Sequence, residues 1–484
     1  MDIYLIVVVI YVLVLLGIGL FKMRQVKSQD DFMVAGRKTT TFYLVMTLVC
    51  TWIGSGSLFG GAGLAFRTGF SELWWSAGGW VGIIIVYFIA HRVRRISQYT
   101  LSDLLEQRYN KYARILGSSA VVLAYMTIAG YQFRGGGRLL NILTGIDPVM
   151  GGLIVCGVVI LFTMAAGMVS IISIDFFNGL IMTGGVLLAL PLALSAVGGW
   201  EQVATLPADR FTAFGEYNGI WAMGVFLPTL LLLLSESSMY QKFFSAKDES
   251  SARKAVVGMV IGVIIIETAL ATLSIIGSSK YNGIAPFYGS DGVVDTATSE
   301  TIILHLARFD LPTFAGILLL CAGVAIILST ANTFLMVSST NITRDFYQRF
   351  FRDANATGSL VLFQRLAVLV IGLLAYAGAN FFPSIMDMAF TAYSMVGAGI
   401  TPALLAAFLW KRVTVAGGVA SIATGMGVTV LITILNVVME SPLMETDYII
   451  LPAAGASVTA LFVVSLLTPA SPEEKWKPFM ANGK

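Results

Sequence analysis

Long, nearly uninterrupted runs of apolar residues dominate this sequence and decide what it can fold into. A run of roughly 20 such residues crosses the hydrocarbon layer as a helix, because no water there can satisfy free backbone groups. The 484 residues are 57% hydrophobic and 12% charged, with a mean hydropathy of +0.83. That is too little charge to cover a soluble protein of this size. We therefore predict an all-α membrane protein.

The apolar runs predict about thirteen spanning helices, an extra first span and core helices 1 to 12. Most of the 30 Lys and Arg residues fall in connections that would share one side, and the positive-inside rule makes that side cytoplasmic. The first run is expected to be retained rather than cleaved as a signal peptide. The sequence thus predicts a multi-pass inner-membrane protein with its N-terminus outside and its C-terminus in the cytoplasm. The predicted spans are 3–22, 42–66, 74–91, 115–143, 149–167, 171–197, 219–241, 255–278, 312–343, 361–380, 384–410, 415–438 and 448–468.

Several function classes do not fit the composition. A net charge of +3 is too small to indicate a nucleic-acid partner. Cys50, Cys156 and Cys321 lie singly inside apolar spans, which argues against disulfides and a zinc site. No cluster of His, Asp or Cys suggests an enzyme or a resident cofactor, and no filter loops suggest a channel. We expect the bilayer to be the only structural partner and a single copy to be the simplest working unit, with the oligomeric state left open.

Two of the predicted spans are interrupted by polar residues. Core helix 1 contains residues 51–57 (TWIGSGS), and core helix 6 contains residues 235–238 (SESS) after a run of leucines. Such breaks free backbone carbonyls, which is tolerable in a membrane where they line a cavity or bind an ion. Close helix packing by small residues is the alternative explanation. Two broken helices five spans apart are typical of an inverted five-plus-five repeat.

Core helix 8 has a polar stripe in which Ile326, Ser329, Thr330 and Thr333 share one helix face. Hydroxyl and carbonyl oxygens suit a hard cation such as sodium and are neutral, so they can release it again. The carbonyls of the broken core helix 1 could complete such a site. Alternatively, the hydroxyls bond back to their own helix, as Ser and Thr often do.

Four segments, in order, resemble the sodium/solute symporter family, whose members carry proline, pantothenate, sialic acid, sugars, choline or iodide. They are residues 30–37 (DDFMVAGR), 173–175 (SID), 241–248 (QKFFSAKD) and the stretch from Ser329-Thr330 to 338–347 (SSTNITRDFY). The resemblance implies a LeuT-type fold of ten core helices in two inverted halves. Residues 1–41 would hold the extra span and a cytoplasmic loop, 42–197 and 198–410 the two repeats, and 411–484 two further spans and a short tail.

The resemblance also implies a sodium site. Its ligands would be the carbonyls of Cys50, Ile53 and Ile326 and the hydroxyls of Ser329 and Thr330.

A second sodium occurs in some members of the family. Its matching residues here, besides Ser329, are Asp175, Asn332 and Thr333, with Asn in place of an expected Ser. That departure leaves one or two sodium ions per cycle open. Asp175 could equally be a structural carboxylate bonded to nearby hydroxyls.

Polar and aromatic residues near the breaks are the candidates for binding a solute. They are Trp52, Ser57, Ser76, Gln132 and Glu236, with Trp75 nearby. Trp52 could hold an ammonium by a cation–π contact or simply pack against core helix 6. Arg134 and Arg138 could contact the solute or be structural, and Arg134 could pair with Glu236 or Asp175. An amino-acid-like zwitterion or a carboxylate fits this set best.

These features predict a sodium-coupled secondary symporter that imports a small organic solute by alternating access. Sodium is the coupling ion, and no cofactor is expected. A proton-coupled carrier of the same fold is the nearest alternative, although Ser329 and Thr330 do not titrate. A nontransporting solute sensor is the other.

Overall fold

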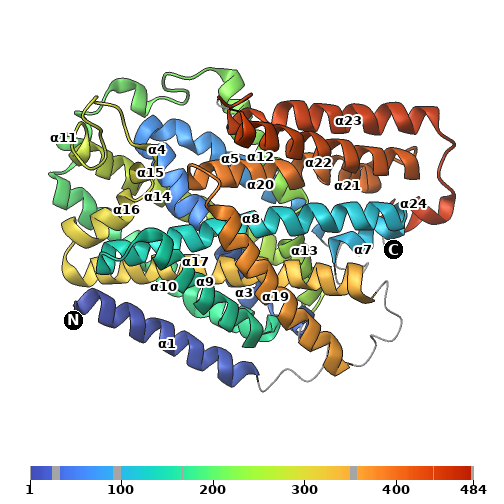
Figure 1. Ribbon diagram of the computed structural model, residues 1–484, viewed down its shortest axis with the longest axis horizontal. Coiled ribbons are helices and arrows are strands. Elements are labelled where there is room, and N and C mark those ends of the chain that lie inside the picture. The colour runs from blue at the N-terminus through green and yellow to red at the C-terminus, as the bar shows by residue number, and fades with distance from the viewer. Residues whose placement is uncertain are drawn as a thin grey trace.

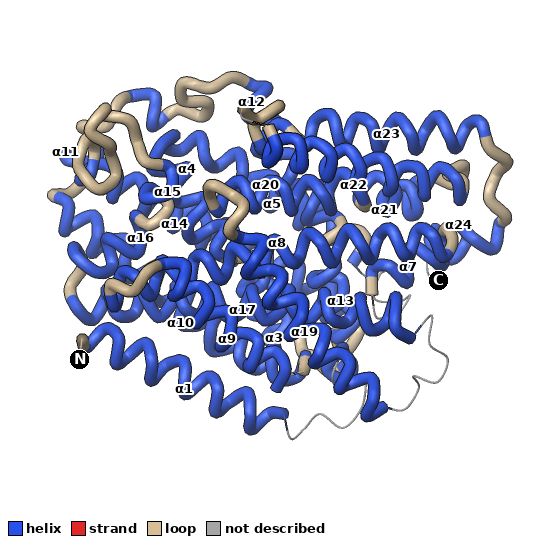
Figure 2. The backbone as a smooth tube through the Cα atoms, in the orientation of Figure 1, coloured by secondary structure: helices blue, strands red, loops and turns tan. Residues whose placement is uncertain are grey.

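A computed structural model of the chain describes residues 2–23, 33–90, 100–165, 167–348, 357–439 and 441–480, and these ranges are almost entirely helical (Figure 2). Short 3-10 and π-helical pieces join the α-helices, and the π-helical segments are Gly56–Gly61, Leu306–Asp310 and Ile342–Tyr347. The α-helices are α1 Ile3–Met23, α3 Thr41–Trp52, α4 Ala62–Thr68, α5 Leu73–Tyr87, α7 Leu101–Arg108, α8 Lys111–Thr144, α9 Pro148–Ala165, α10 Met168–Val197, α11 Trp200–Val203, α12 Gly219–Leu234, α13 Ser237–Ser245, α14 Glu249–Tyr281, α15 Thr296–Ser299, α16 Ile302–His305, α17 Thr313–Asn341, α19 Thr357–Ala379, α20 Ile385–Gly399, α21 Thr401–Leu409, α22 Val415–Val438, α23 Ile450–Leu467 and α24 Glu473–Met480.

Ten helices in the described ranges are long and apolar enough to cross a membrane, or eleven if one bent pair counts as a single span. By this criterion the described part of the chain has ten or eleven spans, where the sequence predicts about thirteen. Every predicted span nevertheless coincides with helix. The bent pair, Thr41–Trp52 with Gly56–Tyr87, contains predicted core helices 1 and 2, and α9 is apolar but shorter than the other spans.

Polar side chains set where several spans begin. Asn110 accepts hydrogen bonds from the first free amides of α8, and Asn218 does the same for α12. Asp248 accepts from the amide of Ser251 at the start of α14, and this bond lowers the pKa of the Asp248 carboxyl. Caps of this kind satisfy amides that have no partner inside the helix. The apolar runs therefore become helices with defined ends.

The most buried spans lie at the centre of the bundle. In α17 83% of the spanning stretch is buried, and in the span Ile385–Leu409, which contains α20 and α21, 89% is buried. Only 22% is buried in α1, which lies along one edge of the bundle (Figure 1). α17 packs against α8, α10 and α3, and α20 packs against α8 and α12. Helices that are apolar on all sides at the edge face lipid, whereas the central helices carry the buried polar residues.

The two ends of the described chain lie at opposite ends of the bundle (Figure 1). The N-terminus lies at the same end of the bundle as α11, α15 and α16, and we call this end of the molecule the long-loop end. Residues 302–310 are helical there, as α16 and the π-helical turn that follows it. Part of segment 30–37, and several basic residues used to predict orientation, lie outside the described residues, so the side facing outward stays a prediction. The division into two repeats at residue 197 likewise stays a prediction. The basic residues outside the described ranges are Arg24, Lys27, Arg92, Arg94, Arg95, Arg349, Arg352 and Lys484.

Close packing of α5 on α12 makes Gly78 sensitive to substitution. A Cβ at this position would lie 2.2 Å from the carbonyl oxygen of Phe226, so Gly78→Ala forces the backbones apart. Overpacking typically costs about 1–3 kcal/mol. Gly157→Ala is the matched control, because nothing lies within 4 Å of its added Cβ. In thermal denaturation of the purified protein only Gly78→Ala should lower the midpoint, and equal midpoints would contradict this packing.

Candidate functional site

The chain leaves the helical path between α3 and the π-helical segment Gly56–Gly61, as predicted for core helix 1. Ile53 has an extended ψ of 101°, and the helices on either side are bent by 53°. The hydroxyl of Thr330 on α17 lies 3.2 Å from the carbonyl oxygen of Cys50 and 3.1 Å from that of Ile53. A hydroxyl has a single proton to donate, so these three converging oxygens keep spare lone pairs. Three of the five predicted sodium ligands therefore come together.

The other two predicted sodium ligands lie on the same helix. Ile326 is buried one turn before Thr330 on α17. Ser329 is also buried, but its hydroxyl donates to Oδ1 of Asp175 at 2.6 Å rather than facing the carbonyls of the break. Ser329 thus lies between the first predicted sodium site and the second.

The break is held from a second side by α8. Gln132 Oε1 accepts a hydrogen bond of 2.8 Å from the amide of Ser55. A Cβ at Gly54 would lie 2.9 Å from Gln132 Nε2 and 3.0 Å from Thr330 Cγ2, so only glycine fits between the two side chains without a shift. Gln132 Nε2 is buried and has no hydrogen-bond partner among the described residues. This amide can therefore still donate to a bound molecule.

A buried carboxylate that the sequence reasoning overlooked lies beside the break. Glu267 on α14 accepts hydrogen bonds from the indoles of Trp52, at 2.9 Å, and Trp80, at 2.7 Å. The hydroxyl of Ser57 donates to it at 3.3 Å. The indole of Trp52 therefore bonds to α14. A lone Glu in the middle of the apolar run 255–278 was the signal that could have identified it.

Two further carboxyl groups are buried near this centre. Glu72 accepts from the hydroxyl of Ser76 at 3.0 Å, and its Oε2 has no partner in the part of the chain that the structure describes. Glu236 stands at the break between α12 and α13, where the hydroxyl of Ser238 donates to it. No Lys or Arg of the described ranges forms an ion pair with Glu72, Glu236 or Glu267. The region is therefore rich in uncompensated acid groups.

Aromatic rings complete the surroundings of the broken helix. Trp75 stacks on Tyr393 with ring centroids 6.2 Å apart, and the hydroxyls of Tyr393 and Tyr131 are 3.4 Å apart. A Cβ at Gly56 would lie 3.1 Å from the Tyr393 hydroxyl. Trp75 Nε1 is buried, again with no partner among the residues described. The rings of Trp75 and Tyr393 thus lie beside the segment that follows the break.

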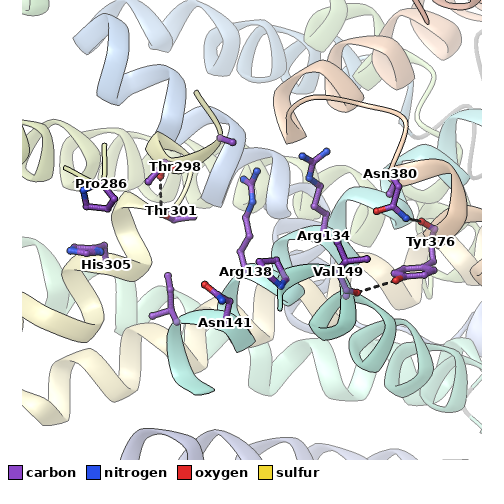
Figure 3. Close-up of a pocket in the computed structure, with 15 residues that line it drawn as sticks. Arg134, Arg138, Asn141, Val149, Pro286, Thr298, Thr301, His305, Tyr376 and Asn380 are labelled. Carbon is purple, nitrogen blue, oxygen red and sulfur yellow. Dashed lines mark hydrogen bonds between the residues drawn. The ribbon is translucent and has the colours of Figure 1, made fainter. Parts of the chain in front are cut away.

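Arg134 and Arg138 lie away from that centre, at a cavity of about 640 Å³ at the long-loop end (Figure 3). Arg134 donates to the carbonyls of Phe382 and Pro383 at 2.5 and 2.7 Å, so the predicted alternative of pairing with Glu236 or Asp175 is wrong. Arg138 forms an ion pair with Glu300. Both guanidinium groups therefore brace the loops around this cavity.

The residues predicted for a second sodium are not all together. Asp175 on α10 accepts from Thr47 and Ser329, and the ammonium of Lys242 lies 3.5 Å from its Oδ2. The hydroxyl oxygen of Thr333 lies 3.5 Å from that of Thr51, so Thr333 faces the same region. Asn332 turns elsewhere, and its Oδ1 accepts from Thr163 at 3.1 Å. Lys242, at the second position of segment 241–248, was not predicted to take part.

Comparison with known proteins gives consistent relatives. The model of the sodium:solute symporter family matches residues 32–425. The sodium/proline symporter of Staphylococcus aureus (strain JH9) is 26% identical over 492 aligned positions, covering 96% of this chain and 92% of that protein. The structure of a Na⁺-coupled sialic acid symporter in a substrate-bound outward-open state matches with a TM-score of 0.79 at 17% identity, over 97% of this chain and 99% of the other.

A more distant solved structure has the same architecture. A transporter of the nucleobase-cation-symport-1 family, in a closed conformation, matches with a TM-score of 0.57 at 11% identity, over 93% of this chain and 97% of the other. These neighbours are transporters of the LeuT fold. The predicted fold class is therefore confirmed.

Replacing Gln132 tests whether its amide supports the break. Gln132→Met keeps the side chain's length but leaves the buried amide of Ser55 without its acceptor. An unsatisfied buried donor costs about 1–3 kcal/mol, so the thermal midpoint of the purified protein should fall. Gln202→Met is the control, because that side chain is only half buried and water can replace its bond to the carbonyl of Ser279. An unchanged midpoint for Gln132→Met would contradict this role.

Proposed function

Because this chain belongs to the sodium:solute symporter family, and is therefore a sodium-coupled solute symporter, we propose that it imports a small amino-acid-like zwitterion by alternating access. Sodium binds first, between the break after α3 and the hydroxyl stripe of α17. This steadies the broken helix and forms the solute pocket beside it. The bundle then closes on the outside and opens on the inside. Each positive charge that moves inward gains roughly 2.3 kcal/mol per 100 mV of membrane potential.

The observation that carries the sodium site is that the hydroxyl oxygen of Thr330 lies 3.2 Å from the carbonyl oxygen of Cys50 and 3.1 Å from that of Ile53. Freed carbonyls in a membrane need a partner, and here both lie against the hydroxyl of Thr330, whose single proton cannot fully satisfy two oxygens. A sodium ion would bind all three oxygens at once. Ser329 would join them by turning from Asp175, and the carbonyl of Ile326 lies one turn away on α17.

The surroundings of Glu267 support a positively charged nitrogen on the solute. An indole can only donate, and each oxygen of Glu267 accepts from one indole, an arrangement that suits an ionised carboxylate. A buried carboxylate without a cation is costly. An ammonium bound beside Trp52 and Ser57 would supply the missing charge. The rings of Trp52 and Trp75 would add cation–π attraction.

The other end of the solute is expected to be a carboxylate. The buried donors Gln132 Nε2 and Trp75 Nε1 are without partners among the described residues and suit a carboxylate oxygen. Arg134 and Arg138 are engaged elsewhere, which disfavours a solute held by a guanidinium at the centre. The relatives' solutes, proline and sialic acid, both contain a carboxylate. Ser76 and Glu236, which lie in the same region, would line the pocket without a direct charge pair.

The sodium proposal is tested by thermal stabilisation with a library of small solutes, in sodium and in potassium buffer. A zwitterionic solute should raise the midpoint in sodium only, and Ser329→Ala/Thr330→Ala should abolish the effect because it removes both hydroxyls. The control is Ser339→Ala/Thr340→Ala, the same pair of residues on α17, whose hydroxyls donate to the carbonyl of Met336. The control should keep the sodium-dependent shift.

Two outcomes would contradict the proposal. Equal stabilisation in potassium would remove the sodium site, and a proton-coupled carrier or a sensor would then fit better. Stabilisation by carboxylates that lack an amine, with none by zwitterions, would keep the sodium site but remove the ammonium position at Glu267.

A further inference from the structure

Lys242 is a completely buried cation between the two broken helices. It lies on α13, directly after the break in core helix 6, and its side chain has no solvent exposure. Its ammonium donates to the carbonyl oxygen of Thr47 at 2.8 Å and to the hydroxyl of Thr51, and it lies 3.5 Å from Oδ2 of Asp175. An ammonium has three protons, and here it meets three oxygen acceptors.

The oxygens around Lys242 come from the same region as the residues predicted to bind a second sodium. Asp175 is the acidic residue of that set, and it also accepts from Ser329. Thr51, which accepts from Lys242, lies 3.5 Å from Thr333, a second member of the set. Asn332, the remaining member and the one that departs from the family pattern, bonds to Thr163 instead. The ammonium therefore lies beside Asp175, the one acidic residue of that set, and its partner Thr51 lies beside Thr333.

Charge makes the two cations mutually exclusive. A sodium ion bound to Asp175 would lie within a few ångströms of a fixed positive charge, and in a buried region that repulsion is weakly screened. Asp175 already has its counter-charge, and both of its oxygens accept hydrogen bonds. Glu236 also lies within electrostatic range of Lys242, but its carboxyl group accepts from the hydroxyl of Ser238 rather than from the ammonium.

We propose that the ammonium of Lys242 is a built-in cation that fills the second cation position, so that this symporter uses a single sodium ion, bound at Thr330. This rests on the proposed sodium site between α3 and α17. The lysine then neutralises Asp175 throughout the cycle, while the exchangeable sodium neutralises no fixed acid. It also ties the chain after the second break to α3 and α10, so both broken helices share one ionic anchor.

The experiment counts sodium sites on the purified full-length chain, using binding of radioactive sodium alone in a scintillation proximity assay. The wild type should bind one sodium per chain. Lys242→Met, which keeps the length of the side chain and removes its charge, should bind two, because Asp175 loses its fixed counter-charge and can coordinate an ion in its place. Lys242→Met/Asp175→Asn should return to one. Lys242→Arg, which keeps the charge, should also bind one.

The outcomes separate this inference from the sodium site on which it rests. Two sodium ions bound by the wild type would overturn the inference and leave the first site intact. A folded Lys242→Met that still binds one would make the lysine a merely structural partner of Asp175 and would also overturn it. If Lys242→Met does not fold, the wild-type count still decides. No sodium bound by the wild type would instead remove the proposed site between α3 and α17.

Discussion

The structure depends on how one interrupted helix is satisfied inside a membrane. Where α3 ends, the backbone of residues 53–55 loses regular helical bonding, and no water in the hydrocarbon layer can replace it. Two side chains from different helices replace part of that bonding: Gln132 accepts from an amide on one side, and two carbonyls on the other share the single hydroxyl proton of Thr330. Gly54 is small enough to let both approach. The break is therefore built into the packing of α8 and α17.

The same arrangement explains why ion and solute can be coupled. The carbonyls that would hold sodium belong to residues 50 and 53, and the side chains that would hold the solute, Trp52 and Ser57, lie on the same short segment. An ion that fixes the carbonyls also fixes these side chains, so sodium binding lowers the cost of ordering the solute pocket. Coupling of this kind needs no long pathway between the two sites.

Local sequence was enough to locate the two breaks, the helices and the polar stripe of α17, because glycine and hydroxyl residues within apolar runs have few structural explanations. Together with the family resemblance, it also predicted that Thr330 lies close to the carbonyls of Cys50 and Ile53. Contacts between distant helices were harder to predict. The partners of Arg134 are backbone carbonyls of a loop, which leave no mark on the sequence. Glu267 and Lys242 were visible as lone charges, but their roles depend on which helices pack around them.

Hydrogen exchange of the purified protein in sodium and in potassium tests the central claim most directly, because it reads the backbone of the break itself. Sodium bound to the carbonyls of residues 50 and 53 and to α17 should slow exchange in peptides covering residues 50–57 and 326–333, and Thr330→Ala should remove the difference. Equal exchange in both salts, with the protein folded, would mean that the break does not bind sodium.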